Sequence, residues 1–224
     1  MNKPQTIAFY NLENLFDPED GEHTRDRNFT PRGLYRWNRE KYRRKIDNLG
    51  KVIARIGPDH AQNPPVILGV CEVENQSCLQ DLVDCDALGK YNYGFVHFDS
   101  DDRRGLDTAF LYRKKHFKLI NYQAFSTEVN GRMGMEPTRD ILHVEGILFD
   151  QPMHILINHW PSRLLGSRST RNKRRTLARE LGKIVDSIYP SLLIRVRWGQ
   201  PASGLRLVVI YRASVCAPCN TLLR

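Results

Sequence analysis

Residues 65–72 read Pro-Val-Ile-Leu-Gly-Val-Cys-Glu, a continuous apolar run that ends on a carboxylate. A run of this length without polar alternation is typical of a strand that is buried on both faces. The position of Glu72 directly after the run bears on function, because a buried carboxylate needs a partner. The stretch therefore predicts both a core strand and a functional group at its end.

The segments around this run predict a chain that mixes helices and strands. Upstream, residues 6–12 predict a short strand, and apolar residues at every third or fourth position of 42–56 mark one face of a helix that is capped by Asn38. Downstream, Asp150-Gln151-Pro152 predicts a hairpin turn. Further elements are expected at 93–98, 108–112, 117–125, 141–149, 153–158 (strands) and 169–188 (a basic helix). This order predicts an α/β or α+β sandwich.

The composition is that of an ordinary globular chain. It has 224 residues with 41% hydrophobic and 26% charged residues, and no apolar run reaches the length of a membrane span. Residues 1–5 show no signal peptide, so we expect a cytoplasmic protein, with secretion left open in case the start of the chain is displaced. Five cysteines with loose spacing favour reduced thiols over a disulfide framework, and the lone Cys216-Ala-Pro-Cys219 lacks a second ligand pair for zinc.

The charge distribution sets the last part of the chain apart. The 34 Lys and Arg residues outnumber the 25 Asp and Glu residues, which gives a formal net charge of +9. The last acidic residue is Asp186, and five arginines follow it without any acidic residue. We therefore divide the chain into a domain over 1–189 and an atypical tail over 190–224, which we interpret as the result of a frameshift, insertion or fusion near residue 190.

Polar side chains stand at the ends of the predicted strands, where sheet proteins often place their ligands. Carboxylate and amide oxygens suit a hard cation such as Mg²⁺, whereas imidazole and guanidinium groups suit a phosphoryl oxygen. Together they indicate a phosphate-plus-metal site. The candidate residues are Asn11, Glu72, Asp107, Arg139, Asn158 and His159.

Four motifs in the chain, taken in order, resemble the endonuclease/exonuclease/phosphatase superfamily, whose fold is that of pancreatic-type deoxyribonucleases. The resemblance covers about residues 5–188. It implies two mixed β-sheets packed face to face with helices outside, the C-terminal part of the second sheet being incomplete here. The motifs are Phe9-Tyr-Asn-Leu-Glu-Asn-Leu-Phe-Asp17, Gly69-Val-Cys-Glu-Val-Glu-Asn75, Arg104-Gly-Leu-Asp-Thr-Ala-Phe-Leu-Tyr-Arg113 and Ile157-Asn-His-Trp-Pro-Ser-Arg163.

The resemblance also implies site roles and a cofactor. Glu72 matches the metal-binding glutamate for Mg²⁺ or Mn²⁺, and Asn11 matches the asparagine beside the metal and the substrate. His159 matches the histidine that contacts the scissile phosphate, and Arg139 resembles the arginine that approaches it. Together with Asn158 and Asp107 as further catalytic candidates, the resemblance implies a metal-dependent phosphodiesterase or phosphomonoesterase, of which we favour an endonuclease-like phosphodiesterase. The basic net charge favours nucleic acid as its partner.

One part of the family pattern is missing from the chain. The Gly-Asp-Phe-Asn-type and Ser-Asp-His-type motifs, which supply the groups that activate water, do not occur, and no Asp, Glu or His follows Ile188. Catalytic competence is therefore in question, and two alternatives stay open. One is a non-catalytic module that binds polyanions through the basic helix, and the other is an inactive gene fragment. The identity of the substrate and the oligomeric state are left open.

Overall fold

The computed structural model describes residues 4–19, 26–57, 61, 63–131, 134–160 and 170–188, and the backbone of 205–211. The strands are β1 (Ile7–Leu15), β2 (Ile67–Val73), β3 (Tyr93–His97), β4 (Asp107–Arg113), β5 (Phe117–Asn130), β6 (Met135–Leu148), β7 (Gln151–His159) and β8 (Leu205–Tyr211). The helices are α1 (Arg39–Ala54), α2 (Gln76–Asp84) and α3 (Arg171–Ile188), with short 3-10 turns η1 (Arg27–Phe29) and η2 (Gly89–Tyr91).

The first sheet has the strand order β1-β2-β4-β3 and is mixed. β1 runs parallel to β2, and β4 runs antiparallel to both of its neighbours. The run that ends at Glu72 forms β2, where only Glu72 itself is not fully buried. The expected central strand is thus confirmed, and the parallel pairing carries β1 and β2 toward the same end of the sheet.

The second sheet has the order β5-β6-β7-β8, and all its described pairings are antiparallel. Here the structure differs from the expected mixed sheet, because β5, β6 and β7 follow one another with only four and two residues between them, too few for a parallel crossover. The turn before β7 uses Phe149 and Asp150, which have φ values of 46° and 66° and match the twist of the flanking strands. It lies one residue earlier than predicted. β8 comes from the part of the chain that we assigned to the tail.

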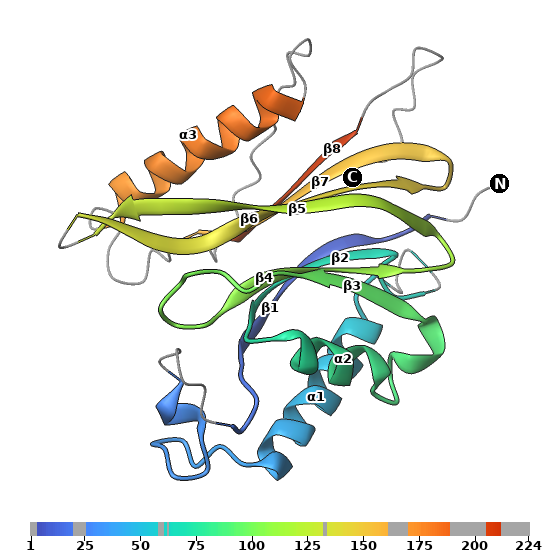
Figure 1. Ribbon diagram of the computed structural model, residues 1–224. Helices are drawn as coiled ribbons and strands as arrows, with labels where there is room; N and C mark the ends of the chain where they lie inside the picture. The colour runs from blue at the N-terminus through green and yellow to red at the C-terminus, as the bar shows by residue number, and fades with distance from the viewer. Residues whose placement is uncertain are drawn as a thin grey trace.

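The two sheets pack face to face with helices outside, so the expected sandwich is confirmed (Figure 1). Phe110 of β4, Phe117 of β5 and Ile157 of β7 belong to the apolar core between the sheets. α1 and α2 cover the outer face of the first sheet through a second apolar cluster, which includes Ile46 and Leu79. α3 covers part of the outer face of the second sheet.

The helices follow from caps and apolar spacing. The Asn38 side chain accepts a hydrogen bond from Lys41 N at 3.0 Å, which confirms the predicted start of α1. Asn75 caps α2 in the same way, accepting from Cys78 N at 2.9 Å. α2 was not predicted, because its nine residues are too few for the helical period to stand out.

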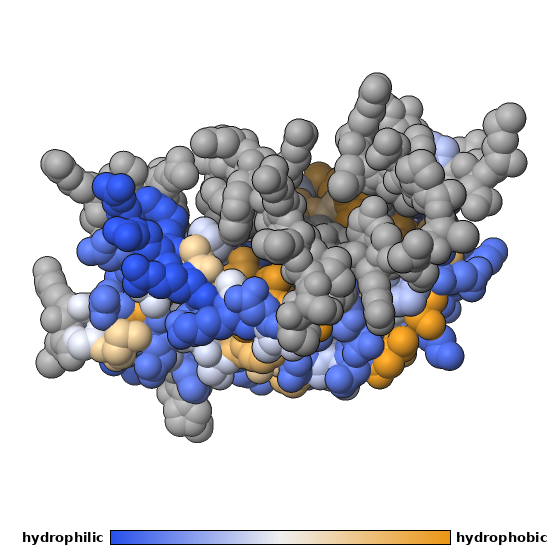
Figure 2. Space-filling view, turned by 90° about the horizontal axis from the view of Figure 1, so that it is seen from above, coloured by the Kyte–Doolittle hydropathy of each residue, from blue (hydrophilic) through white to orange (hydrophobic). Residues whose placement is uncertain are grey.

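α3 is amphipathic, with Leu177, Leu181 and Ile184 buried against the second sheet. Its solvent-facing side carries hydrophilic side chains, which gather over the helix in Figure 2. None of the helices in the described ranges combines the length and the apolarity that a bilayer crossing requires.

A buried histidine lies on the outer face of the second sheet. His143 Nε2 lies 3.0 Å from His154 Nδ1, and its Nδ1 lies 3.2 Å from the Gln123 amide nitrogen. Because an amide nitrogen can only donate, Nδ1 of His143 accepts and Nε2 carries the proton. Burial, assisted by His154, lowers the pKa of His143 to about 4.

Replacing Phe110 by Ala should lower the free energy of unfolding by about 3–5 kcal/mol, because it leaves a void between the sheets. Phe110 is fully buried and packs against the rings of Tyr112 and Phe117. Chemical denaturation measures the change. Val52→Ala, at a position 42% exposed on α1, is the control and should stay within about 0.5 kcal/mol. Equal effects of the two changes would contradict the described core.

The free energy of unfolding should also fall in acid, because His143 takes up a proton more readily in the unfolded chain. The ordinary pKa of 6.5 applies in the unfolded chain and about 4 in the folded one, so the unfolded state binds the proton first. His143→Gln should therefore remove about 1–2 kcal/mol of the stability loss between about pH 7.5 and about pH 5. Denaturation of both proteins at the two pH values tests this. Parallel pH profiles would show that His143 is accessible to protons in the folded state.

Candidate functional site

The predicted polar residues follow strands that end on the same side of the sandwich. Glu72 stands near the end of β2, and Asp107 opens the antiparallel neighbour β4 opposite Val73. His159 ends β7 in the facing sheet. β1 ends beside β2 because the two strands are parallel. The topology therefore brings groups that are distant in sequence to one edge of the core.

Glu72 sits on a local distortion of β2. Its φ is 63°, in the left-handed region that residues with a Cβ rarely adopt, and the register with β4 shifts between Cys71 and Val73. Such a bulge turns a side chain away from the regular strand face. The Glu72 carboxylate accepts a hydrogen bond from Asn14 N at 3.1 Å and keeps 17% of its side chain exposed. It is thus fixed but open to solvent.

β1 bulges beside Glu72. Glu13 and Asn14 have φ values of 56° and 59°, and the register with β2 shifts between Asn11 and Leu15. The Asn11 side chain accepts a hydrogen bond from Glu13 N at 2.8 Å, so it shapes this bulge. Its predicted role toward metal and substrate stays a prediction.

Lys45 of α1 stabilises the same bulge. Its ammonium group donates to the carbonyl oxygens of Glu13 and Asn14, the second at 3.1 Å, and lies 5.7 Å from the centre of the Trp37 ring. Burial lowers the pKa of Lys45, an effect that Glu13 and Glu72 oppose. Lys45 was not predicted as part of the site, because one basic residue in a basic helix carries no distinguishing signal.

His159 faces Glu72 across the interface between the sheets. Its Nε2 lies 3.5 Å from Glu72 Oε1, and its Nδ1 has no hydrogen-bond partner in the part of the chain that the structure describes. Burial and then the charge of Arg104 lower the pKa of His159 to about 4. The imidazole is therefore neutral near pH 7, and Glu72 and His159 are brought together as predicted.

Two arginines share one acidic partner near this pair. Arg139 Nε lies 3.5 Å from one carboxylate oxygen of Asp102, and Arg104 Nε lies 3.3 Å from the other. Arg139 is buried, and its Nε and Nη2 atoms make no hydrogen bond within the described ranges. Arg104 and Asp102 were not predicted as site residues, although Arg104 opens one of the four motifs.

Within the described residues, neither Asn158 nor Asp107 forms a hydrogen bond or ion pair with Glu72 or His159. Side chains alternate along a strand, so Asn158 shares the face of Leu156 toward α3, whereas His159 shares the face of Ile157 between the sheets. Asp107 accepts hydrogen bonds from Ser100, one from its backbone N at 3.3 Å. Burial, partly offset by these bonds, raises the pKa of Asp107 to about 7. Catalytic roles for both residues remain predictions.

Glu72 fits a hard divalent cation. Mg²⁺ is commonly bound by one or two carboxylates together with water and substrate phosphate, and Glu72 offers one carboxylate that is open to solvent. Two other groups of potential metal ligands occur in the described residues, and neither contains Glu72. They are Asp17 with Glu74 and Cys78, and His97 with Asp99 and Asp107.

Hydrogen bonds account for the first of these groups. Glu74 accepts from Asp17 N at 2.8 Å, and Asp17 accepts from the Asn75 side chain at 2.7 Å. Burial, together with the nearby acidic residues Asp17 and Asp26, raises the pKa of Glu74 to about 8, although the Asp17 N–H opposes this. Both carboxylates of this group thus already have hydrogen-bond partners among the described residues.

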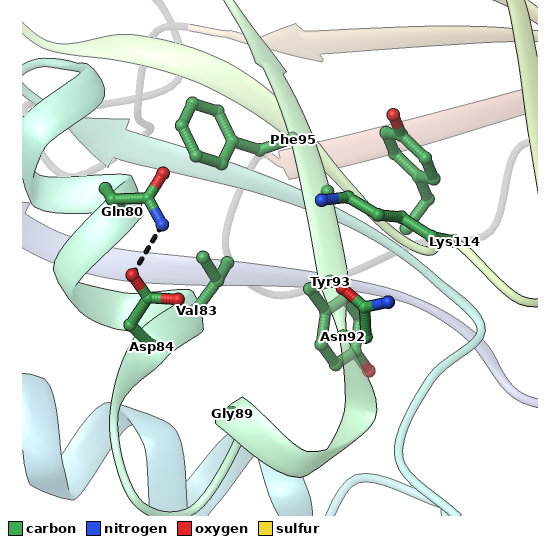
Figure 3. A pocket seen from close by; sticks show the side chains of 10 residues that line it. Gln80, Val83, Asp84, Gly89, Asn92, Tyr93, Phe95 and Lys114 are labelled. Atoms are coloured by element: carbon green, nitrogen blue, oxygen red, sulfur yellow. Dashed lines mark hydrogen bonds between the residues drawn. The ribbon is translucent and has the colours of Figure 1, made fainter.

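A pocket of about 330 Å³ lies at the opposite end of the first sheet (Figure 3). Gln80 and Asp84 of α2 line one side and are hydrogen-bonded at 2.6 Å. Phe95 and Lys114 also line it. It includes none of the candidate site residues and is not assigned a function.

Comparison with known proteins gives one family match. A sequence model of the Endonuclease/Exonuclease/phosphatase family matches residues 6–191. No curated protein matches the chain significantly. The chain is similar to the solved structure of an endonuclease/exonuclease/phosphatase from Bacteroides vulgatus, with 18% identity, a TM-score of 0.46, and coverage of 80% of this chain and 59% of that one.

Two further solved structures are similar. Humanized D. rerio TDP2 with 14 mutations has 16% identity and a TM-score of 0.43, over 82% of this chain and 55% of that one. TDP2 from C. elegans has 17% identity and a TM-score of 0.44, over 68% of this chain and 41% of that one. The chain therefore spans about half the length of the structures that it matches.

Lys45→Met should destabilise the protein by about 1–3 kcal/mol, because two backbone carbonyls of the β1 bulge lose a charged donor. Amide hydrogen exchange at Asn14 should become faster in the same variant, since this N–H reaches Glu72 only while the bulge is held. Lys41→Met is the matched control, because Lys41 donates to Tyr35 O at 2.8 Å on the surface. If both variants show the same exchange at Asn14, Lys45 does not hold the bulge.

Proposed function

The chain belongs to the endonuclease/exonuclease/phosphatase family, and we propose that it is a divalent-metal-dependent phosphodiesterase whose centre lies between Glu72 and His159. The observation that carries the proposal is the approach of His159 Nε2 to Glu72 Oε1 across two sheets, at 3.5 Å. A metal-side carboxylate and a phosphate-side imidazole are thereby adjacent. We place this centre in a domain over residues 1–189, and the family match, which ends at residue 191, supports that extent.

Glu72 would hold Mg²⁺ or Mn²⁺. When bound, such an ion withdraws charge from a phosphoryl oxygen and from the leaving oxygen. The bulge at Glu72 and the hydrogen bond from Asn14 N fix the carboxylate before the substrate arrives. Such preorganisation lowers the cost of reorganising the site during the reaction.

His159, Arg104 and Arg139 form the phosphate side of the proposed site. Because His159 is neutral, it can donate one N–H to a phosphoryl oxygen, and it does not repel a cation bound at Glu72. Asp102 holds both guanidinium groups at distances that leave donor atoms for an anion. Arg104 adds positive charge close to His159, which favours the binding of a phosphate there.

The general base that would activate water is the one catalytic group to which we assign no residue with a direct contact to the proposed centre. Hydrolysis needs a base to take the proton of the attacking water. The family's Ser-Asp-His-type motif does not occur within residues 1–224. Asp107 is our predicted carboxylate for catalysis, but its contacts are with Ser100 and His97. Turnover must therefore be measured.

We propose nucleic acid as the substrate class. The net charge of +9 favours a polyanion. Leu34 and Tyr35 are exposed, flanked by Arg32 and Arg36, which have no ion pair in the described part of the chain. The Tyr35 ring packs on Phe29 at 4.8 Å, so it offers a supported surface on which a base can stack. Lys45, whose ammonium group lies 5.7 Å from the ring of the adjoining Trp37, connects this segment to the β1 bulge beside Glu72.

The second candidate is a non-catalytic module that binds polyanions. The basic, solvent-facing side of α3 favours it, and this side lies on the outside of the second sheet (Figure 2). A helix face of this kind is more often simply solvated. The candidate predicts DNA binding that weakens with salt and is accompanied by no cleavage.

Hydrolysis of a single-stranded oligonucleotide in the presence and absence of Mg²⁺ tests the proposal. Wild type should require the metal, and Glu72→Gln and His159→Gln should each lower kcat/KM by on the order of 100-fold. Glu40→Gln, on the surface of α1, is the control and should retain activity. Salt-sensitive binding without cleavage by the wild type would favour the binding module instead.

A further inference from the structure

A second group of metal-ligand side chains lies beside the proposed centre. His97 ends β3, Asp99 follows two residues later, and Asp107 opens β4. One ligand atom from each of the three lies within 4.8 Å of the others. His97 Nδ1 is 3.7 Å from Asp99 Oδ1, and His97 Nε2 is 3.9 Å from Asp107 Oδ2.

The burial of two of these side chains demands an explanation. The His97 side chain is fully buried and that of Asp107 is 4% exposed. Neither ring nitrogen of His97 has a hydrogen-bond partner within the described residues. An imidazole buried without a partner is destabilising, because it loses its hydrogen bonds to water and gains none. The group therefore contains polar atoms that contacts among the described residues leave unsatisfied.

The spacing distinguishes a metal site from a hydrogen-bonded cluster. Separations of 3.7 and 3.9 Å are too long for hydrogen bonds. The two distances start from different ring nitrogens, and only one of these nitrogens can bind a given ion. If Nε2 binds it, Asp107 Oδ2 at 3.9 Å lies near the separation of about 3.3–3.6 Å between two ligands that each lie about 2.0–2.2 Å from one tetrahedral ion. The exposed Asp99 side chain can then rotate to bring its carboxylate to the same ion.

The surroundings provide support and access. Ser100 donates to both carboxylate oxygens of Asp107 and so fixes its orientation, as hydrogen-bonded neighbours of metal ligands commonly do. The Asp99 side chain is 79% exposed, which gives an ion a path from solvent.

We propose that His97, Asp99 and Asp107 bind a divalent transition-metal ion of the Zn²⁺ type, at a site distinct from the Glu72 centre. One nitrogen and two carboxylate oxygens suit such an ion, and water completes its coordination. The ion would tie the end of β3 to the start of β4. The loop between them carries Asp102 and Arg104, so the ion positions the phosphate-side arginine.

Co²⁺ substituted for Zn²⁺ reports the ligands directly through its visible spectrum. The full-length chain, freed of metal with a chelator, is titrated with Co²⁺ and then Zn²⁺, with affinity followed by calorimetry. Asp99→Asn should weaken Zn²⁺ binding at least 10-fold. Asp101→Asn, an exposed neighbour outside the cluster, is the matched control and should bind as wild type. Asp99→Cys should add an intense thiolate-to-Co²⁺ charge-transfer band.

The outcomes separate this site from the proposed centre. Glu72→Gln should leave the Zn²⁺ titration of the His97 site unchanged while it removes Mg²⁺-dependent hydrolysis. Equal affinity in wild type and Asp99→Asn, or Asp99→Cys without a new charge-transfer band, would overturn the proposal. So would loss of all Zn²⁺ binding in Glu72→Gln, since the binding would then belong to the Glu72 centre. Circular dichroism confirms that each variant is folded.

Discussion

The packing of two sheet faces against each other is the constraint on which the rest of this structure depends. Phe110 and Ile157 meet in that interface, and their strands continue directly into polar residues at one end. Glu72 and His159 approach only because β2 and β7 are held at the spacing of the core. The packing of the apolar core therefore determines the distance between Glu72 and His159, and no long loop is needed to position them.

The core sets the distance between the two strand ends, and local backbone distortion then sets the direction of the Glu72 side chain. A regular β2 would leave the side chain after Cys71 on an ordinary strand face, whereas the left-handed conformation at Glu72 redirects it. The neighbouring bulge in β1 supplies the N–H that fixes the carboxylate. Conformations of this kind cost about 1–3 kcal/mol each and persist where surrounding contacts enforce them. Here Lys45, wedged under the bulge, is such a contact.

Much of this arrangement could be predicted from the sequence, and the remainder has physical reasons for being missed. The apolar run before Glu72 and the helical spacing after Asn38 are strong local patterns, and both are confirmed. The proximity of Glu72 and His159 followed from the family motifs. The pairing of Asp102 with Arg139 and the contact of Lys45 with β1 join segments that are more than thirty residues apart. The His97 group depends on how the loop between β3 and β4 folds back on itself. No period or spacing in the chain encodes them, and β5 and β6 extended further than their apolar residues indicated.

The parallel pairing of β1 with β2 also has a consequence for how the protein folds. Ile7 pairs with Ile67, so about sixty residues must close into a loop before the first contact forms. The β5–β6 hairpin, by comparison, pairs residues that are close along the chain. Folding rates fall as contacts become more distant in sequence. The β5–β6 and β6–β7 hairpins can therefore nucleate early, whereas the Glu72 centre takes shape only when the distant β1–β2 pairing is complete.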